Sequence, residues 1–127
     1  NAPVPPGLIR GVVALYPGCR RMGQALPAWN PAVPVLLLLG ALDDWTPARW
    51  FEALAAAVPR GAARVEVHTY PGAHHGFDMP GVPLRELVGL AGPRNTAVHI
   101  GTEPVAREDA LVRIPAFLAQ QGGVASR

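Results

Sequence analysis

The sequence predicts an α/β fold, a partial parallel sheet flanked by helices. Three segments carry the apolar patterns of strands, at residues 11–16, 33–39 and 64–70. Two further segments, from residue 46 onward and from about 104 to 121, place apolar residues at helical spacing. The order strand, strand, helix, strand, loop, helix favours parallel strands covered by helices.

The three predicted strands differ in how their apolar residues are distributed. Residues 11–16 form a short apolar run that ends at the turn signal Pro17-Gly18. Residues 33–39 are apolar without alternation, which suits a parallel strand covered on both faces. Residues 64–70 alternate between apolar and polar, so we expect this strand near the edge of the sheet. Because three strands would leave an edge of the first one unpaired, we also expect a partner segment that precedes it.

The first predicted helix begins at Thr46-Pro47. Thr46 is expected to cap it, and Pro47 suits the first helical position, where a missing N–H costs nothing. Pro59-Arg60-Gly61 ends the helix. Its apolar face consists of Trp50, Phe51, Leu54 and Val58.

The C-terminal part of the chain is predicted to be a long loop followed by a helix. Residues 78–103 are rich in Gly and Pro, and we expect one short helical turn within them, near 84–90. The final helix, from about Pro104 to Gln121, should contain a kink at Pro115. Its expected apolar face consists of Leu111, Ile114 and Leu118.

Composition narrows the class of protein. The chain has 127 residues, about one small domain, and half of them are apolar, so a core can form. The net charge is only +2, and the scattered basic residues form no stripe with aromatic residues, which argues against a nucleic-acid partner. The longest apolar run, 33–39, is too short to span a membrane. Cys19 is the single cysteine, so no intrachain disulfide can form.

Two of the predicted strands are followed by groups suited to acid–base chemistry. Asp43 and Asp44 follow the second strand, and His74 and His75 follow the third. The carboxyl ends of parallel strands lie along one edge of a sheet, so a carboxylate and an imidazole from these loops can meet. A buried carboxylate fixes the tautomer of a histidine and stabilises the imidazolium that forms when the histidine takes a proton.

The residues of these two loops carry a family resemblance. Gly40, Asp43 and Pro47 fill the pattern Gly-x-x-Asp-x-x-x-Pro, and His75 and Phe77 later fill His-x-Phe. The two patterns resemble the acid and base loops of α/β-hydrolases, whose triad runs nucleophile, acid, base along the chain.

A closer resemblance is to the dienelactone hydrolase family. It rests on Asp-Asp-Trp-Thr-Pro at 43–47 and on Tyr-Pro-Gly-Ala-His-His-Gly-Phe-Asp at 70–78, with support from 13–19 and 106–118, and it leaves out 79–103. The resemblance implies the C-terminal half of an α/β-hydrolase fold, with Asp43 as triad acid and His75 as base. It further implies a small-molecule ester or lactone as substrate and neither a metal nor an organic cofactor.

The nucleophile of that triad has no counterpart in this sequence. In the family it sits in a Gly-x-Cys-x-Gly or Gly-x-Ser-x-Gly elbow before the strand at 11–16, and neither pattern occurs here. The chain also begins at Asn1 without an initiator Met. We therefore expect residues 1–127 to be the C-terminal portion of one hydrolase domain, inactive without its N-terminal part.

Two alternatives stay open. The chain can be a non-catalytic half-domain that only associates with another segment. It can also be a fragment of a prolyl-oligopeptidase-like peptidase, since those enzymes share the acid and base loops. The run Tyr-Pro-Gly-Ala before the histidines favours the dienelactone type.

Other polar residues have plainer interpretations. Asp44 is expected to cap the helix or favour its dipole, although it can substitute as the acid. His74 does not fit the His-x-Phe spacing, and His68 and His99 are expected to be structural or solvated. Cys19 lacks the helix that should follow a nucleophile elbow, so we expect a small residue near the pocket.

Two groups of residues call for a binding interpretation as well. The adjacent histidines with Cys19 and the two aspartates suggest zinc, but their spacing fits no usual ligand pattern. Tyr16, Trp45 and Phe77 can line an apolar pocket, yet core packing explains them nearly as well.

Overall fold

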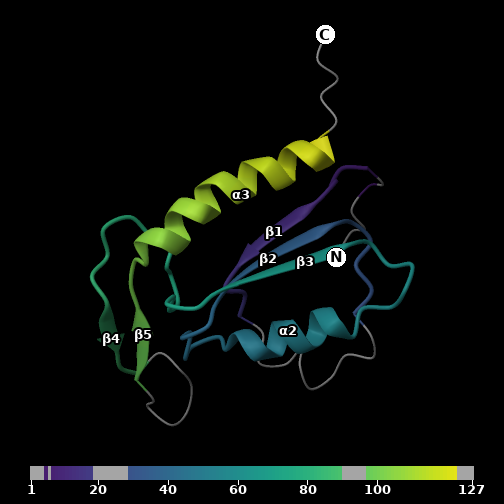
Figure 1. Cartoon of the computed structure of the whole chain (residues 1–127). Helices are drawn as coiled ribbons and strands as arrows, with labels where there is room; N and C mark the ends of the chain where they lie inside the picture. The colour runs from purple at the N-terminus through teal and green to yellow at the C-terminus, as the bar shows by residue number, and fades with distance from the viewer. Residues whose placement is uncertain (1–4, 6, 19–28, 90–96, 123–127) are drawn as a thin grey trace.

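The computed structural model describes residues 5, 7–18, 29–89 and 97–122 (Figure 1). Its main sheet has three parallel strands, and the middle one in space is the second in the chain. The strands are β1 (Val12–Leu15), β2 (Val35–Gly40) and β3 (Val65–Tyr70). The predicted α/β arrangement and all three predicted strands are confirmed.

The central strand β2 explains why the sheet has two covered faces. All six of its residues are buried, and alternate side chains of a strand point to opposite faces. Leu36 and Leu38 join the core cluster on the side of α3 (Pro104–Gly122). Leu37 and Leu39 join the cluster on the side of α2 (Ala48–Ala56). Figure 1 shows the two helices on opposite faces of the sheet.

The helix α3 forms where the sequence predicts it but buries a different face. Its buried residues are Ala106, Ala110 and Phe117, whereas Leu111 and Leu118 are 56% and 47% exposed. The expected apolar face is therefore wrong for these two leucines, whereas Ile114 packs against the core as expected. Small alanines let the helix lie close to the sheet, and the one aromatic side chain then fills the remaining space.

The helix α2 begins one position later than predicted, with Pro47 as its N-cap and no capping hydrogen bond from a side chain. The capping role expected of Thr46, or of Asp44, is therefore wrong. The Thr46 hydroxyl instead lies within hydrogen-bonding distance of the buried Asp43 carboxylate, and the Asp44 carboxylate contacts the His99 imidazole.

The segment between β3 and α3 contains a second, two-stranded sheet. β4 (Arg85–Leu87) pairs antiparallel with β5 (Val98–Ile100). The helical turn expected near 84–90 is therefore wrong for β4, because pairing with a distant strand satisfies its backbone. β5 also touches the loop after β3, through a parallel bridge from Ile100 to His75 and a hydrogen bond of 3.1 Å from Gly101 N to the His75 carbonyl.

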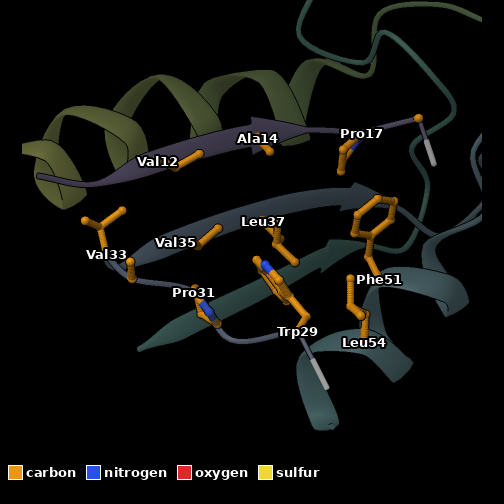
Figure 2. Close-up of a pocket in the computed structure, with 12 residues that line it drawn as sticks. Val12, Ala14, Pro17, Trp29, Pro31, Val33, Val35, Leu37, Phe51 and Leu54 are labelled. Carbon is orange, nitrogen blue, oxygen red and sulfur yellow. The ribbon is translucent and has the colours of Figure 1, made fainter. Parts of the chain in front are cut away.

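Among the residues that the structure describes, one edge of β1 has no neighbouring strand. Within the described residues this strand pairs only with β2. Beside it, between β1, β2 and α2, lies an apolar groove with a volume of about 390 Å³ (Figure 2). Its lining includes Val12, Ala14, Trp29, Leu37, Phe51 and Leu54. No helix in the described ranges is long and apolar enough to cross a membrane.

The end of β2 is fixed by a close approach of two loops. Leu42 N donates a hydrogen bond of 2.9 Å to the Ala73 carbonyl. An added Cβ at Gly40 would lie 2.5 Å from that same carbonyl oxygen and 3.1 Å from the carbonyl oxygen of His74. Only a residue without a side chain lets the loop after β2 meet the loop after β3.

We expect Gly40→Ala to lower the free energy of unfolding by about 1–3 kcal/mol, because backbone atoms must shift to make room. Urea denaturation followed by circular dichroism measures the effect. Gly122→Ala is the matched control, since an added Cβ there meets nothing within 4 Å. Equal stability of the two variants would contradict the close approach.

Candidate active site

Three strand ends meet at one edge of the main sheet. Tyr16 follows β1, Asp43 lies in the loop after β2, and His75 lies in the loop after β3. The parallel register places these ends side by side. The two loops expected to meet from sequence are in contact, and the end of β1 joins them.

The side chains of Asp43 and His75 form a direct hydrogen bond. The distance from His75 Nδ1 to Asp43 Oδ2 is 2.9 Å, and the aspartate side chain is fully buried while that of the histidine is 18% exposed. The other carboxylate oxygen, Oδ1, accepts hydrogen bonds from the backbone N–H groups of Trp45 at 2.9 Å and Thr46 at 2.7 Å. A buried carboxylate satisfied in this way favours the tautomer with hydrogen on Nδ1, which leaves Nε2 able to accept a proton.

The hydroxyl of Thr46 lies at the centre of this arrangement. Its Oγ1 is 2.9 Å from Asp43 Oδ2 and 3.1 Å from His75 Nδ1. It also donates to the backbone carbonyl of Tyr16 at 3.1 Å. The sequence pattern predicts a capping role for Thr46 because it reveals neighbours along the chain, whereas Tyr16 and His75 are distant in sequence.

Two aromatic rings flank the imidazole. The ring centroid of Tyr16 is 4.3 Å from that of His75, and the centroid of Trp45 is 4.7 Å away. Phe77 is fully buried in the core cluster below, where its ring meets Tyr16 at 5.5 Å. Of the three aromatics considered for a pocket, two therefore contact the imidazole and the third is core.

A second aspartate–histidine pair lies beside the first. Asp44 accepts hydrogen bonds from His99, at 2.8 Å from the backbone N and 2.6 Å from Nδ1. The side chains of both are 40% exposed, and the His74 ring lies 5.7 Å from that of His99. This pair joins β5 to the loop of Asp43.

The charges of this outer pair shift both pKa values. The hydrogen bond to Asp44 raises the pKa of His99 above its usual value. Partial burial opposes ionisation of Asp44, but the hydrogen bonds from His99 prevail and lower the pKa of that carboxyl. Glu86, which is paired with His99 across β4 and β5, also favours the protonated imidazole.

Other residues considered from sequence lie elsewhere. His68 in β3 faces Asp109 of α3 at 3.8 Å. Cys19 lies outside the described residues. Among the residues that the structure describes, no group of three or more His, Cys, Asp or Glu side chains is arranged to hold a metal ion.

The outer pair should stabilise the protein only in a window of pH. The raised pKa of His99 gives stability that is complete below its unfolded value of about 6.5 and is lost as pH rises through the folded value. The lowered pKa of Asp44 gives stability that is complete above about 3.9 and is lost as pH falls through the folded value.

We therefore expect the coupling free energy in a double-mutant cycle of Asp44→Asn and His99→Gln to be largest between about pH 4 and 6.5. Urea denaturation at several pH values measures it. A coupling free energy that does not change with pH would contradict the ionic character of the pair.

The contact between Asp43 and His75 is suited to acid–base chemistry, and the chain as a whole matches a known family. A model described as the dienelactone hydrolase family matches residues 3–122. The chain has no match among curated proteins and none among solved structures. The family match spans both strand-end loops and the terminal helix, and also residues 79–103, where the resemblance of motifs is lost. With a partial α/β fold and a family match over most of its length, this chain belongs to the dienelactone hydrolase family, whose fold is that of the α/β-hydrolases.

Proposed function

We propose that this chain supplies the acid, Asp43, and the base, His75, of a triad that hydrolyses carboxylic esters or lactones of small molecules. The observation that carries the proposal is the 2.9 Å contact between the imidazole Nδ1 and a fully buried carboxylate. Membership of the dienelactone hydrolase family supports the reaction class.

In the proposed reaction a cysteine or serine nucleophile attacks the ester carbonyl while His75 Nε2 takes its proton. Asp43 stabilises the imidazolium that results. The imidazolium then gives this proton to the leaving alkoxide, and the acyl group remains on the nucleophile. Water attacks the acyl-enzyme with His75 again as base, which releases the acid and restores the nucleophile. None of these steps requires a cofactor.

The nucleophile, in this proposal, belongs to a segment that precedes residue 1 in the same fold. Two features support the placement. The open side of β1 can pair with a further parallel strand, and the apolar groove lies on the same face as α2. Crossovers between parallel strands are right-handed, so a helix that connects an added strand to β1 would lie on the face of α2. That helix would fill the groove of Figure 2.

We expect both Asp43→Asn and His75→Ala to lower kcat by about 10²–10⁴-fold in the protein that includes this preceding segment. His75→Ala removes the base, and Asp43→Asn removes the charge that stabilises the imidazolium. Hydrolysis of an activated ester such as p-nitrophenyl acetate measures the effect. His74→Ala is the matched control, with a change of less than about threefold, because its imidazole does not contact Asp43. Equal losses in the His74 and His75 variants would refute the assignment of the base.

The origin of the nucleophile has its own test. We expect the coding sequence upstream of Asn1 to encode a strand followed by Gly-x-Cys-x-Gly or Gly-x-Ser-x-Gly, and residues 1–127 alone to show no turnover above the His75→Ala variant. Turnover by residues 1–127 that depends on His75 would place the nucleophile inside this chain, with Cys19→Ala as the next variant to assay. An upstream region without such an elbow would favour the non-catalytic half-domain.

A further inference from the structure

The residue after β1 has an unusual backbone. Tyr16 has φ of 36°, and among the described residues it is the only non-glycine with a positive φ. Bulky side chains seldom adopt this region, because Cβ crowds the backbone, and such strain persists only where the surroundings enforce it. The contacts around Tyr16 should therefore show what enforces its conformation.

The backbone of Tyr16 is held from both sides. Its N–H donates to the Leu38 carbonyl at 2.8 Å, which continues the pairing of β1 with β2. Its own carbonyl then accepts the hydrogen bond from Thr46 Oγ1 at 3.1 Å. The same Thr46 oxygen lies within hydrogen-bonding distance of Asp43 and His75, so the strained residue is joined directly to the aspartate–histidine pair.

The side chain of Tyr16 reaches the other loop. Its ring lies against the imidazole of His75, with centroids 4.3 Å apart. Its hydroxyl donates a hydrogen bond of 2.8 Å to Asp78 Oδ1, three residues beyond the base. Burial first, and then this hydrogen bond and the nearby carboxylate charges, raise the pKa of the phenol well above its usual value, so it stays a donor.

From these contacts we infer that Tyr16 is a positioning residue, which holds the His75 imidazole against Asp43. The backbone of one residue fixes the acid loop through Thr46, and its side chain fixes the base loop. Asp78 in turn keeps the phenol ring beside the imidazole. The inference rests on the proposed function for its catalytic consequence, but the placement of the imidazole can be measured without turnover.

The test uses three variants that differ in what they remove. Tyr16→Leu removes the ring, Tyr16→Phe removes only the hydrogen bond between the phenol and the carboxylate, and Asp78→Ala removes that hydrogen bond together with the charge of the carboxylate. Tyr70→Phe is the matched control, because Tyr70 also donates to a carboxylate, Asp109 Oδ2 at 2.7 Å, and its ring has no stacking contact with His75. Nitrogen chemical shifts of the ¹⁵N-labelled imidazole of His75 report its tautomer.

We expect the wild type and Tyr70→Phe to show His75 mainly as the Nδ1–H tautomer, since Asp43 accepts that hydrogen. Tyr16→Leu should move the shifts toward the tautomer mixture of a free imidazole. Tyr16→Phe and Asp78→Ala should move them in the same direction by a smaller amount, and they remain informative if Tyr16→Leu does not fold. Wild-type shifts in all three variants would overturn the positioning role.

Kinetics in the protein with the preceding segment supply the second readout. Tyr16→Leu should lower kcat about tenfold or more and change KM by less than about twofold, because a displaced base impairs proton transfer and not substrate binding. A rise in KM of about tenfold with an unchanged kcat would overturn the inference. Absence of turnover in the wild type would refute the proposed function alone, since the chemical shifts still judge the role of Tyr16.

Discussion

The burial of one carboxylate is the constraint on which the site depends. A charge without solvent is costly unless hydrogen bonds replace the lost water. For Asp43 the replacement comes from two backbone N–H groups and an imidazole. Because the two N–H groups belong to the loop that carries Asp43, the third donor must come from the neighbouring strand end. Folding of this loop and placement of the His75 imidazole are in this sense the same event.

Parallel strands align the two loops without any polar residue in the central strand. The β2 strand carries no polar side chain, yet its register with β3 brings Gly40 opposite Tyr70 and so aligns the two loops that follow. Backbone hydrogen bonds from Ala41 N to the Tyr70 carbonyl and from Leu42 N to the Ala73 carbonyl complete the alignment. The Asp43–His75 pair thus lies on irregular loops, whereas the precision of its placement comes from regular, apolar strands.

Sequence reasoning succeeded where the signal is local or belongs to a single strand. The continuous apolar run of β2 and the loop motifs around Asp43 and His75 could be read directly. It failed where the partner is distant in the chain. The hydroxyl of Thr46 binds an imidazole 29 residues away, and Asp44 binds His99 across 55 residues. Likewise β4 is too short to be recognised as a strand from the sequence without its partner β5. The burial of Phe117 in place of Leu111 depends on the shape of the sheet beneath the helix.

The complete burial of Phe77, two residues after His75, links the site to distant parts of the core. Its ring shares a core cluster with Leu36 of β2 and Phe117 of α3, so the backbone that carries the imidazole is tied to the packing of α3 on the sheet. Interiors are too dense to absorb a change of volume locally. A change of side-chain volume at Phe117 would therefore be passed through Phe77 to the position of the His75 imidazole.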